Sequence, residues 1–241
     1  MRLLLYTTLS FLLLISLPSS LSARAVEGIL LPDKDVLVSS PVENVIMEVD
    51  VEEGESVAQD QLLAVLDQRT QQLQVALWEK RLELLQVAFE SAQNLGRDNI
   101  VSREETLTAE IERDLARIQL DLAKAALDDT ELRAGLEGII LEVFKEPGEM
   151  VRRGEEMFRI VNTETVFVQL FLPADEAIRL NLDQSLTVNF PDSSPIPTIQ
   201  ASVHFIDPSV DPNSGFQRIR LKIPNPGNQL KAGLRCTVLL P

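Results

Sequence analysis

Cysteine, histidine and aromatic residues are scarce in this chain of 241 residues. It has one cysteine (Cys236), one histidine (His204) and only 5% aromatic residues. A single cysteine cannot form a disulfide within the chain, and one histidine cannot supply the ligand clusters that hold zinc. The sequence also has no Gly-rich phosphate loop and no nucleophile elbow. We therefore expect no enzyme activity, no cofactor and no resident metal, and we expect Cys236 to be a buried strand residue.

Positive charge is also scarce. The chain has 22 basic and 37 acidic residues, which gives a formal net charge of −15. Removal of the leader described below would take away Arg2 and Arg24 and leave 20 basic residues. A strongly acidic surface repels phosphate backbones, so we expect no nucleic-acid partner.

Only the N-terminus carries a long apolar run. Leu3–Leu17 follows Arg2, ends at Pro18, and is followed by the small-x-small pattern Ala23-Arg24-Ala25. This arrangement is typical of a signal peptide, whereas a helix needs about 20 apolar residues to span a bilayer. We predict a cleaved signal peptide over residues 1–25 and export to the periplasm. Retention of the leader as a membrane anchor is the alternative.

One sequence motif occurs twice. Residues 45–57 superpose on residues 139–151 at a constant offset of 94 positions, and the register continues to Leu66 on Ile160. Each copy has an alternating strand, a Gly-Glu turn and a short strand. Neither copy has enough strands to bury its own apolar face. We therefore expect residues 26–66 and 132–162 to pack together as a small β-sandwich.

Two details of the repeat make further predictions. Glycine at the turns, Gly54 and Gly148, suits a backbone that requires positive φ. The alternation of Val45, Met47, Val49 and Val51 predicts that these side chains share the buried face of one strand.

The segment between the copies, residues 67–131, has the pattern of two helices. Asp67 is expected to cap the first helix, and Ser102 to Glu105 form a capping box at the start of the second. Apolar residues recur at spacings of three and four, as in a coiled-coil seam. The predicted seams are Trp78, Leu82, Leu85, Phe89 and Ala92 in the first helix, and Leu107, Ile111, Leu115, Ile118, Leu122 and Ala125 in the second.

The break in this pattern at residues 96–101 predicts a turn. Two seams joined by a short turn make an antiparallel coiled-coil α-hairpin, inserted between the half-motifs. We expect it to project from the sandwich with its tip at residues 96–101. A helical pair folded back onto the body is the alternative.

Short strands fill the C-terminal third. Strand-like runs at residues 185–190, 201–206, 216–223 and 234–240 are separated by turn clusters, and residues 173–178 form a helical turn. This pattern predicts a small closed β-barrel over residues 163–241.

The order of these modules resembles periplasmic adaptor subunits, also called membrane fusion proteins of the HlyD type. Residues 51–67 resemble the first half of the adaptors' lipoyl-like domain, residues 147–154 the second half, and residues 203–234 the closing strands of their β-barrel. The resemblance implies a mainly β fold with a split lipoyl-like β-sandwich, a coiled-coil hairpin insertion and a small C-terminal β-barrel. No residues follow the barrel for the membrane-proximal domain common in pump adaptors, so we expect a short variant.

The resemblance also implies a role in transport. Such adaptors link an inner-membrane transporter, of the resistance-nodulation-division (RND) or ABC type, to an outer-membrane channel for efflux or secretion. They associate with copies of themselves, here expected as a trimer or hexamer. Their hairpin tip docks a TolC-type channel through a motif onto which Leu95, Ser102 and Ala109 fall, whereas Ser91, Ala92 and Thr106 depart from it. The resemblance thus implies Leu95, Ser102 and Ala109 as partner-binding residues.

Two other classes of function remain open. A lipoyl or biotin carrier presents a modifiable lysine between its half-motifs, but this chain has the helical segment there, and no lysine follows Met47-Glu48. A metal-binding periplasmic protein could use Met47, Met150 and Met157 as ligands. Met47 and Met157 lie in strand patterns, where hydrophobic packing is the expected role.

Overall fold

The computed structural model describes residues 24–97, 100, 102–191 and 196–241. These residues divide into two compact units. Residues 24–29, 169–221 and 235–241 form one unit, and residues 30–168 and 222–234 form the other. Residues 1–23, most of the predicted signal peptide, lie outside the described part, while Arg24 and Ala25 open the first strand. No helix in the described part of the chain has both the length and the hydropathy of a membrane span.

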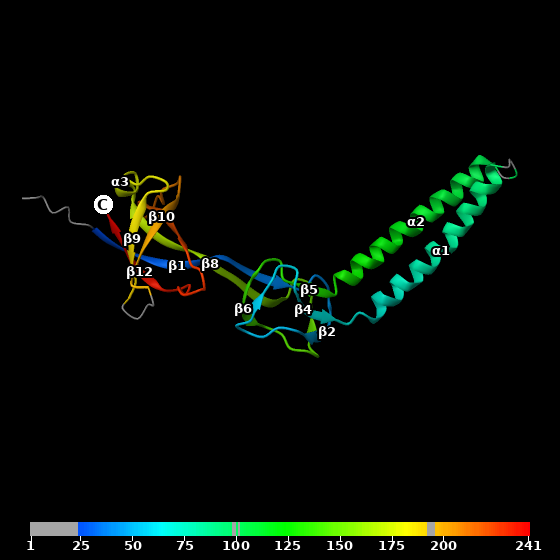
Figure 1. Cartoon of the computed structure of the whole chain (residues 1–241), viewed down its shortest axis with the longest axis horizontal. Coiled ribbons are helices and arrows are strands. Elements are labelled where there is room, and N and C mark those ends of the chain that lie inside the picture. The colour runs from blue at the N-terminus through cyan, green and yellow to red at the C-terminus, as the bar shows by residue number, and fades with distance from the viewer. Residues whose placement is uncertain (1–23, 98–99, 101, 192–195) are drawn as a thin grey trace, which may run out of the picture. The chain divides into compact units, whose positions relative to one another are not determined.

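The second unit contains the sandwich that the repeat predicted (Figure 1). Its strands are β2 (Asn44–Val49), β3 (Ser56–Val57), β4 (Leu62–Leu66), β5 (Glu131–Arg133), β6 (Gly138–Val143), β7 (Met150–Val151) and the first part of β8 (Glu156–Pro173). The two copies exchange their short strands, because β3 of the first copy pairs with β6 of the second and β7 of the second pairs with β2 of the first. The two halves therefore form one domain.

Hydrogen bonds at the two turns show how closely the copies interlock. The amide of Gly54 donates to the carbonyl of Ile140 at 2.8 Å, and the amide of Gly148 donates to the carbonyl of Ile46 at 2.8 Å. Both glycines have positive φ, +86° and +93°, as the turns required. Each copy thus supplies the backbone partners that the other copy's turn needs.

The core of the sandwich also follows the repeat. Buried side chains stand in matching positions, such as Ile46 with Ile140 and Leu66 with Ile160. The predicted burial of Met47 is wrong, because Ile46 is buried and Met47 is exposed. A bulge between Ile46 and Glu48 interrupts the alternation of β2. The second copy has the same bulge between Ile140 and Glu142.

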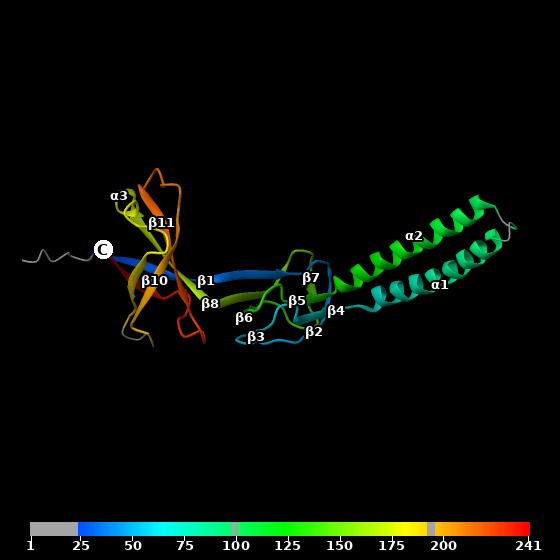
Figure 2. The ribbon, with the colours of Figure 1, turned by 45° about the horizontal axis from the view of Figure 1, so that its top comes forward.

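The predicted helical pair is formed by α1 (Arg69–Arg97) and α2 (Arg103–Asp128). The helices run side by side in both views of Figures 1 and 2. They leave the sandwich from β4 and β5, which are neighbours in one sheet. The helices pack on each other, with Phe89 of α1 and Ala116, Leu120 and Ala123 of α2 buried.

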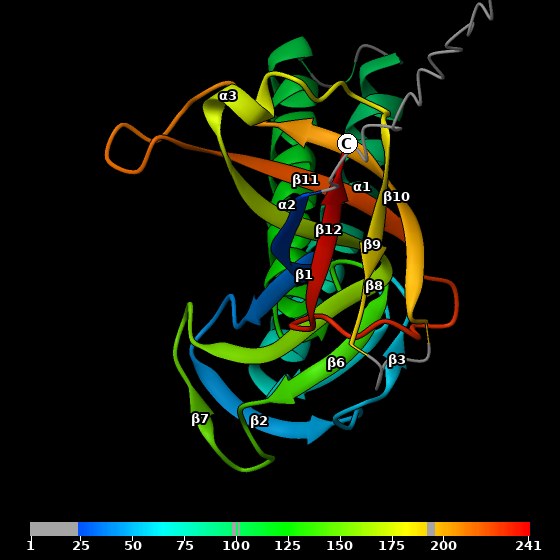
Figure 3. The ribbon, with the colours of Figure 1, turned by 90° about the vertical axis from the view of Figure 1, so that its left-hand side faces the viewer.

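The first unit belongs to the predicted β-barrel, and several of its strands are seen lengthwise in Figure 3. The barrel strands are β1 (Arg24–Ser39), β8, β9 (Ser185–Asn189), β10 (Thr198–Ile206), β11 (Phe216–Pro224) and β12 (Arg235–Leu240), with α3 (Ala174–Ala177) after β8. The order β1-β12-β9-β10-β11-β8 closes through a β1–β8 pairing. Residues 26–29, grouped with the sandwich by the sequence, pair here with β12.

Cys236 lies in β12 and is buried, as predicted. Burial raises the pKa of its thiol to about 11, since a thiolate would lose its hydration there.

Candidate partner-binding site on the helical hairpin

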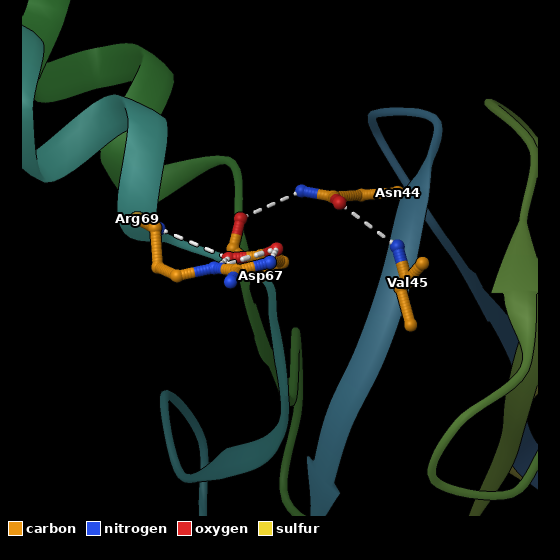
Figure 4. A network of polar contacts seen from close by, with 4 residues as sticks. All are labelled: Asn44, Val45, Asp67 and Arg69. Carbon is orange, nitrogen blue, oxygen red and sulfur yellow. Dashed lines mark hydrogen bonds and ion pairs between the residues drawn. The ribbon is translucent and has the colours of Figure 1, made fainter.

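The first helix is tied to the sandwich at its N-terminal end (Figure 4). The side-chain amide of Asn44 donates to the carbonyl of Asp67 at 2.8 Å, and its oxygen accepts from the amide of Val45 at 2.8 Å. The amide of Asp67 donates in turn to the carbonyl of Val45 at 2.9 Å. Asn44 therefore bridges β2 to the residue at which the chain leaves β4 for α1.

The prediction that Asp67 caps the helix is off by one residue, because α1 begins at Arg69 and the carbonyl of Gln68 accepts the first helical bond, from the amide of Gln72 at 2.9 Å. The carboxylate of Asp67 accepts from the amide of Arg69 at 3.1 Å and pairs with the Arg69 guanidinium at 2.5 Å. Bonds from the Arg69 side chain and amide lower the pKa of Asp67 to about 2. The carboxylate is therefore charged at every physiological pH, and it holds a free amide of the first helical turn.

The second helix returns to the sandwich at a matching point. The amide of Leu66 donates to the carbonyl of Thr130 at 2.9 Å. Thr130 is buried, and its hydroxyl donates to the carbonyl of Leu127 in the last turn of α2. The two feet of the hairpin are thus hydrogen-bonded to each other as well as to the strands.

The interface between the helices confirms the predicted seam on α1 but not on α2. Phe89 is buried, and Trp78, Leu82, Leu85 and Ala92 are partly buried. On α2 the predicted seam is wrong: its large residues are exposed, with Leu122 at 59%, whereas Leu120 is at 7%. The shielded row of α2 is instead Thr106, Ala109, Arg113, Ala116, Leu120, Ala123 and Leu127.

The physical reason lies in the size of the facing residues. The α1 seam carries Trp78 and Phe89, so the facing side of α2 fits closely with small side chains such as Ala116 and Ala123. The larger apolar residues of α2 follow two positions later, about 200° around the helix. The α2 sequence contains two rows with coiled-coil spacing, one that faces α1 and one that faces away from it. The prediction chose the second, outer row because its side chains are more hydrophobic.

Arg113 is the charged member of the inner row. Its guanidinium lies over the ring of Phe89, 4.2 Å from the centroid, and bonds to Asp114 at 2.6 Å. A cation over an aromatic face is stabilised by the ring quadrupole, more so when it is shielded from water. This contact fixes the height of α1 against α2. Sequence reasoning missed it, although Arg113 keeps the spacing of the inner row.

The three tip residues differ in their surroundings. Leu95 is 41% exposed near the end of α1. Ser102 caps α2, and the predicted capping box is confirmed, since its hydroxyl accepts from the Glu105 amide while the Glu105 carboxylate accepts from the Ser102 amide. Ala109 lies in the shielded row. Residues 98, 99 and 101 of the predicted turn fall outside the described residues.

The residues considered for the other functions are placed as follows. Met157 is buried in the sandwich core, whereas Met47 and Met150 are exposed. Within the described residues, no group of three or more His, Cys, Asp or Glu side chains could hold a metal ion. The position where a carrier presents its lysine is occupied by the two helices.

Comparison with known proteins agrees with this architecture. Residues 34–162 match the family model of the CzcB-like, barrel-sandwich hybrid domain, and residues 165–241 match that of the CusB-like, beta-barrel domain. A MacA–MexA chimeric protein that contains the Pseudomonas aeruginosa MexA α-hairpin superposes with a TM-score of 0.81 at 16% identity. That superposition covers 90% of this chain and 80% of the chimera.

Two curated relatives match most of the chain. An uncharacterized protein of Haemophilus influenzae is 23% identical over 217 residues, which cover 89% of this chain and 56% of the relative. The cobalt-zinc-cadmium resistance protein CzcB of Cupriavidus metallidurans is 24% identical over 242 residues, covering 90% and 46% respectively. The chain thus spans about half the length of these relatives.

Proposed function

This chain belongs to the membrane fusion protein family of periplasmic adaptors, and from that premise we propose that it links an inner-membrane transporter to an outer-membrane channel. The transporter is of the RND or ABC type, and the complex serves efflux or secretion. The leader, residues 1–25, delivers the chain to the periplasm, where it works beside the inner membrane. Several copies associate, as a trimer or hexamer.

The observation that carries this proposal is the attachment of the hairpin. Both of its feet are hydrogen-bonded, through Asn44 to Asp67 on one side and through Leu66 to Thr130 on the other. The sandwich beneath is closed by reciprocal bonds between its halves. An arm held at both feet keeps a defined direction, which suits a contact with a partner at the tip.

For the channel contact we propose the tip of the hairpin. Leu95 offers an exposed apolar side chain and is assigned the direct contact. Ser102 and Ala109 support it, because Ser102 starts α2 and Ala109 packs toward α1. The proposed partner is a TolC-type outer-membrane channel.

Removal of the hairpin tests the adaptor function. Because Leu66 and Thr130 are hydrogen-bonded neighbours, a short Gly-Ser turn can replace residues 69–128 and leave the sandwich closed. In a strain that lacks the gene, the full chain should restore growth on a panel of metal salts, dyes and antibiotics, or restore secretion. The truncated chain should fold, as judged by thermal melting, and restore neither. Equal restoration by both proteins would refute the bridging role.

A photo-crosslinking residue at Leu95 tests the tip. The matched control places the same group at Gln72, which is exposed near the base of α1. Crosslinks to an outer-membrane channel should form from position 95 and not from position 72, as identified by mass spectrometry. Equal yields from both positions, or none from either, would remove the tip from the mechanism.

A further inference from the structure

The first strand of the barrel begins at Arg24, inside the stretch that the sequence pattern assigns to the leader. The six residues Arg24–Ile29 pair one to one with β12, from Arg24 opposite Leu240 to Ile29 opposite Arg235 (Figure 3). The same strand closes the barrel through its pairing with β8. The last residues of the predicted leader are therefore part of a folded domain.

Arg24 makes a second contact, with the short helix α3. Its guanidinium donates to and pairs with the carboxylate of Glu176, whose side chain is only 21% exposed. The other oxygen of that carboxylate is buried, and it has no hydrogen-bond partner within the described residues. A shielded carboxylate that has lost its cation destabilises a fold, because burial has already removed most of its hydration. Loss of Arg24 would therefore leave the charge of Glu176 uncompensated.

Two peptide bonds near the start of this strand have the sequence that signal peptidase accepts. One bond follows Ala25, in the pattern Ala23-Arg24-Ala25, and the other follows Ser22, in the pattern Ser20-Leu21-Ser22. Each pattern places small residues at the first and third positions before the bond. Both patterns come shortly after the apolar run, so the sequence alone does not choose between the two bonds.

The fold distinguishes the two bonds. The bond after Ala25 lies inside β1, and cutting there removes two of the six residue pairs with β12 together with the ion pair between Arg24 and Glu176. Leu240, which is buried, would also lose the strand residue that lies opposite it. The bond after Ser22 lies before the start of β1, so cutting there leaves all of these contacts in place.

Access for the protease favours the same bond. A protease needs a locally unpaired backbone, so a bond within a paired strand can be cut only before the barrel folds. A bond before the strand does not depend on the order of folding and cleavage. We infer that the leader is cut between Ser22 and Ala23, so that the mature chain keeps Arg24 to hold the start of β1 against α3. This inference rests on the proposed export to the periplasm and shortens the proposed leader by three residues.

The N-terminus of the exported protein tests the cleavage site directly. We would express the full chain with a C-terminal affinity tag, purify it from the periplasmic and membrane fractions, and determine its N-terminus by sequencing and by intact mass. The mature chain should start at Ala23 and contain residues 23–241. A start at Val26 would overturn the inference, and so would a chain that is never cut.

A matched pair of substitutions asks which bond the protease uses. Ser22→Leu and Ala25→Leu each place a large side chain directly before one of the two bonds, where the protease requires a small one. Ser22→Leu should abolish the product that starts at Ala23. Ala25→Leu should leave the position of the cut unchanged, and Ala25 is exposed in β1, so the barrel should tolerate the larger side chain. The opposite pattern would assign the cut to the bond after Ala25 and overturn the inference.

The need for the retained residues can be measured on the two candidate mature chains, residues 23–241 and 26–241. The shorter chain should melt several degrees lower, because it lacks two strand pairs and an ion pair. Cys236 of β12 lies opposite Gly28, so its labelling by maleimide reports the opening of this strand pair, and labelling should be several-fold faster in the shorter chain. Equal melting and equal labelling would show that the barrel does not need Arg24, and would overturn the inference.

The proposed function is tested separately by these experiments and by growth. An uncut chain that is held in the inner membrane would overturn the cleavage site and leave the adaptor function standing. A chain that starts at Ala23, but whose loss leaves growth and secretion unchanged, would refute the adaptor function and leave the cleavage site standing.

Discussion

The stability of the hairpin should depend on Leu120 and hardly at all on Leu122. These residues are two positions apart on α2 and chemically identical, but Leu120 is 7% exposed and Leu122 is 59% exposed. Hydrophobic spacing in the sequence selects Leu122 for the seam, whereas the structure selects Leu120. Replacing each with alanine therefore separates the two interpretations with a matched pair.

The magnitudes follow from burial. Leu120→Ala removes a nearly buried side chain, for which the cost ranges from about 2 to 5 kcal/mol. The lower part of that range, about 2–3 kcal/mol, applies because a two-helix seam at the surface can relax into the space. Leu122→Ala removes a side chain that is already mostly hydrated, so the cost in the single chain stays within about 0.5 kcal/mol.

Urea unfolding followed by circular dichroism at 222 nm measures both variants. Protein concentration should be kept low, so that any association between copies adds nothing to the measured stability. Leu120→Ala should lower the midpoint clearly while the slope stays unchanged. A larger loss for Leu122→Ala than for Leu120→Ala at high dilution would refute the assignment of the seam.

Four further predictions concern other parts of the chain. Asn225→Ala should destabilise by about 2–3 kcal/mol in calorimetry, because this buried amide donates to two carbonyls and accepts from one amide. Gly54→Ala and Gly148→Ala should each cost about 1–2 kcal/mol in urea unfolding, and by equal amounts, since both backbones have positive φ in equivalent turns. Because the folded-state pKa of Asp67 is lowered, its contribution to stability should be full above about pH 4 and disappear as the pH falls through about 2; Asp67→Asn should remove this part of the acid transition seen by circular dichroism. Cys236 should resist maleimide at pH 8 until the protein is unfolded, because its pKa is raised to about 11.

The sequence was sufficient to predict the features that rest on repetition and on local capping. The constant offset between Gly54 and Gly148 predicted that two half-motifs meet, and their backbone bonds are reciprocal. Ser102 and Glu105 predicted the start of α2 to the residue, because a capping box depends on residues only three positions apart.

Features that depend on packing between distant residues could not be read in the same way. The bulge beside Met47 places Ile46, rather than Met47, on the buried face of β2. No residue type in the sequence identifies the position of such a bulge. The shielded row of α2 consists largely of small side chains together with Arg113. These residues suit the interface because they pack against the large rings of α1, such as Phe89, and the sequence of α2 alone does not contain that information. The residues of the tip were predicted by resemblance, and their role in partner binding stays a prediction.

The exchange of short strands between the two copies has a consequence for the folding of the chain. The bond partners Gly54 and Ile140 are far apart in sequence, so a direct encounter between them would require closure of a long loop, which slows folding. Helices form from local contacts in microseconds or less, and a formed hairpin brings Leu66 beside Thr130. The helical arm should therefore condense first and act as a tether that presents the two sheet fragments to each other. In this protein the segment that reaches outward in the finished molecule is also the one that makes its body quick to assemble.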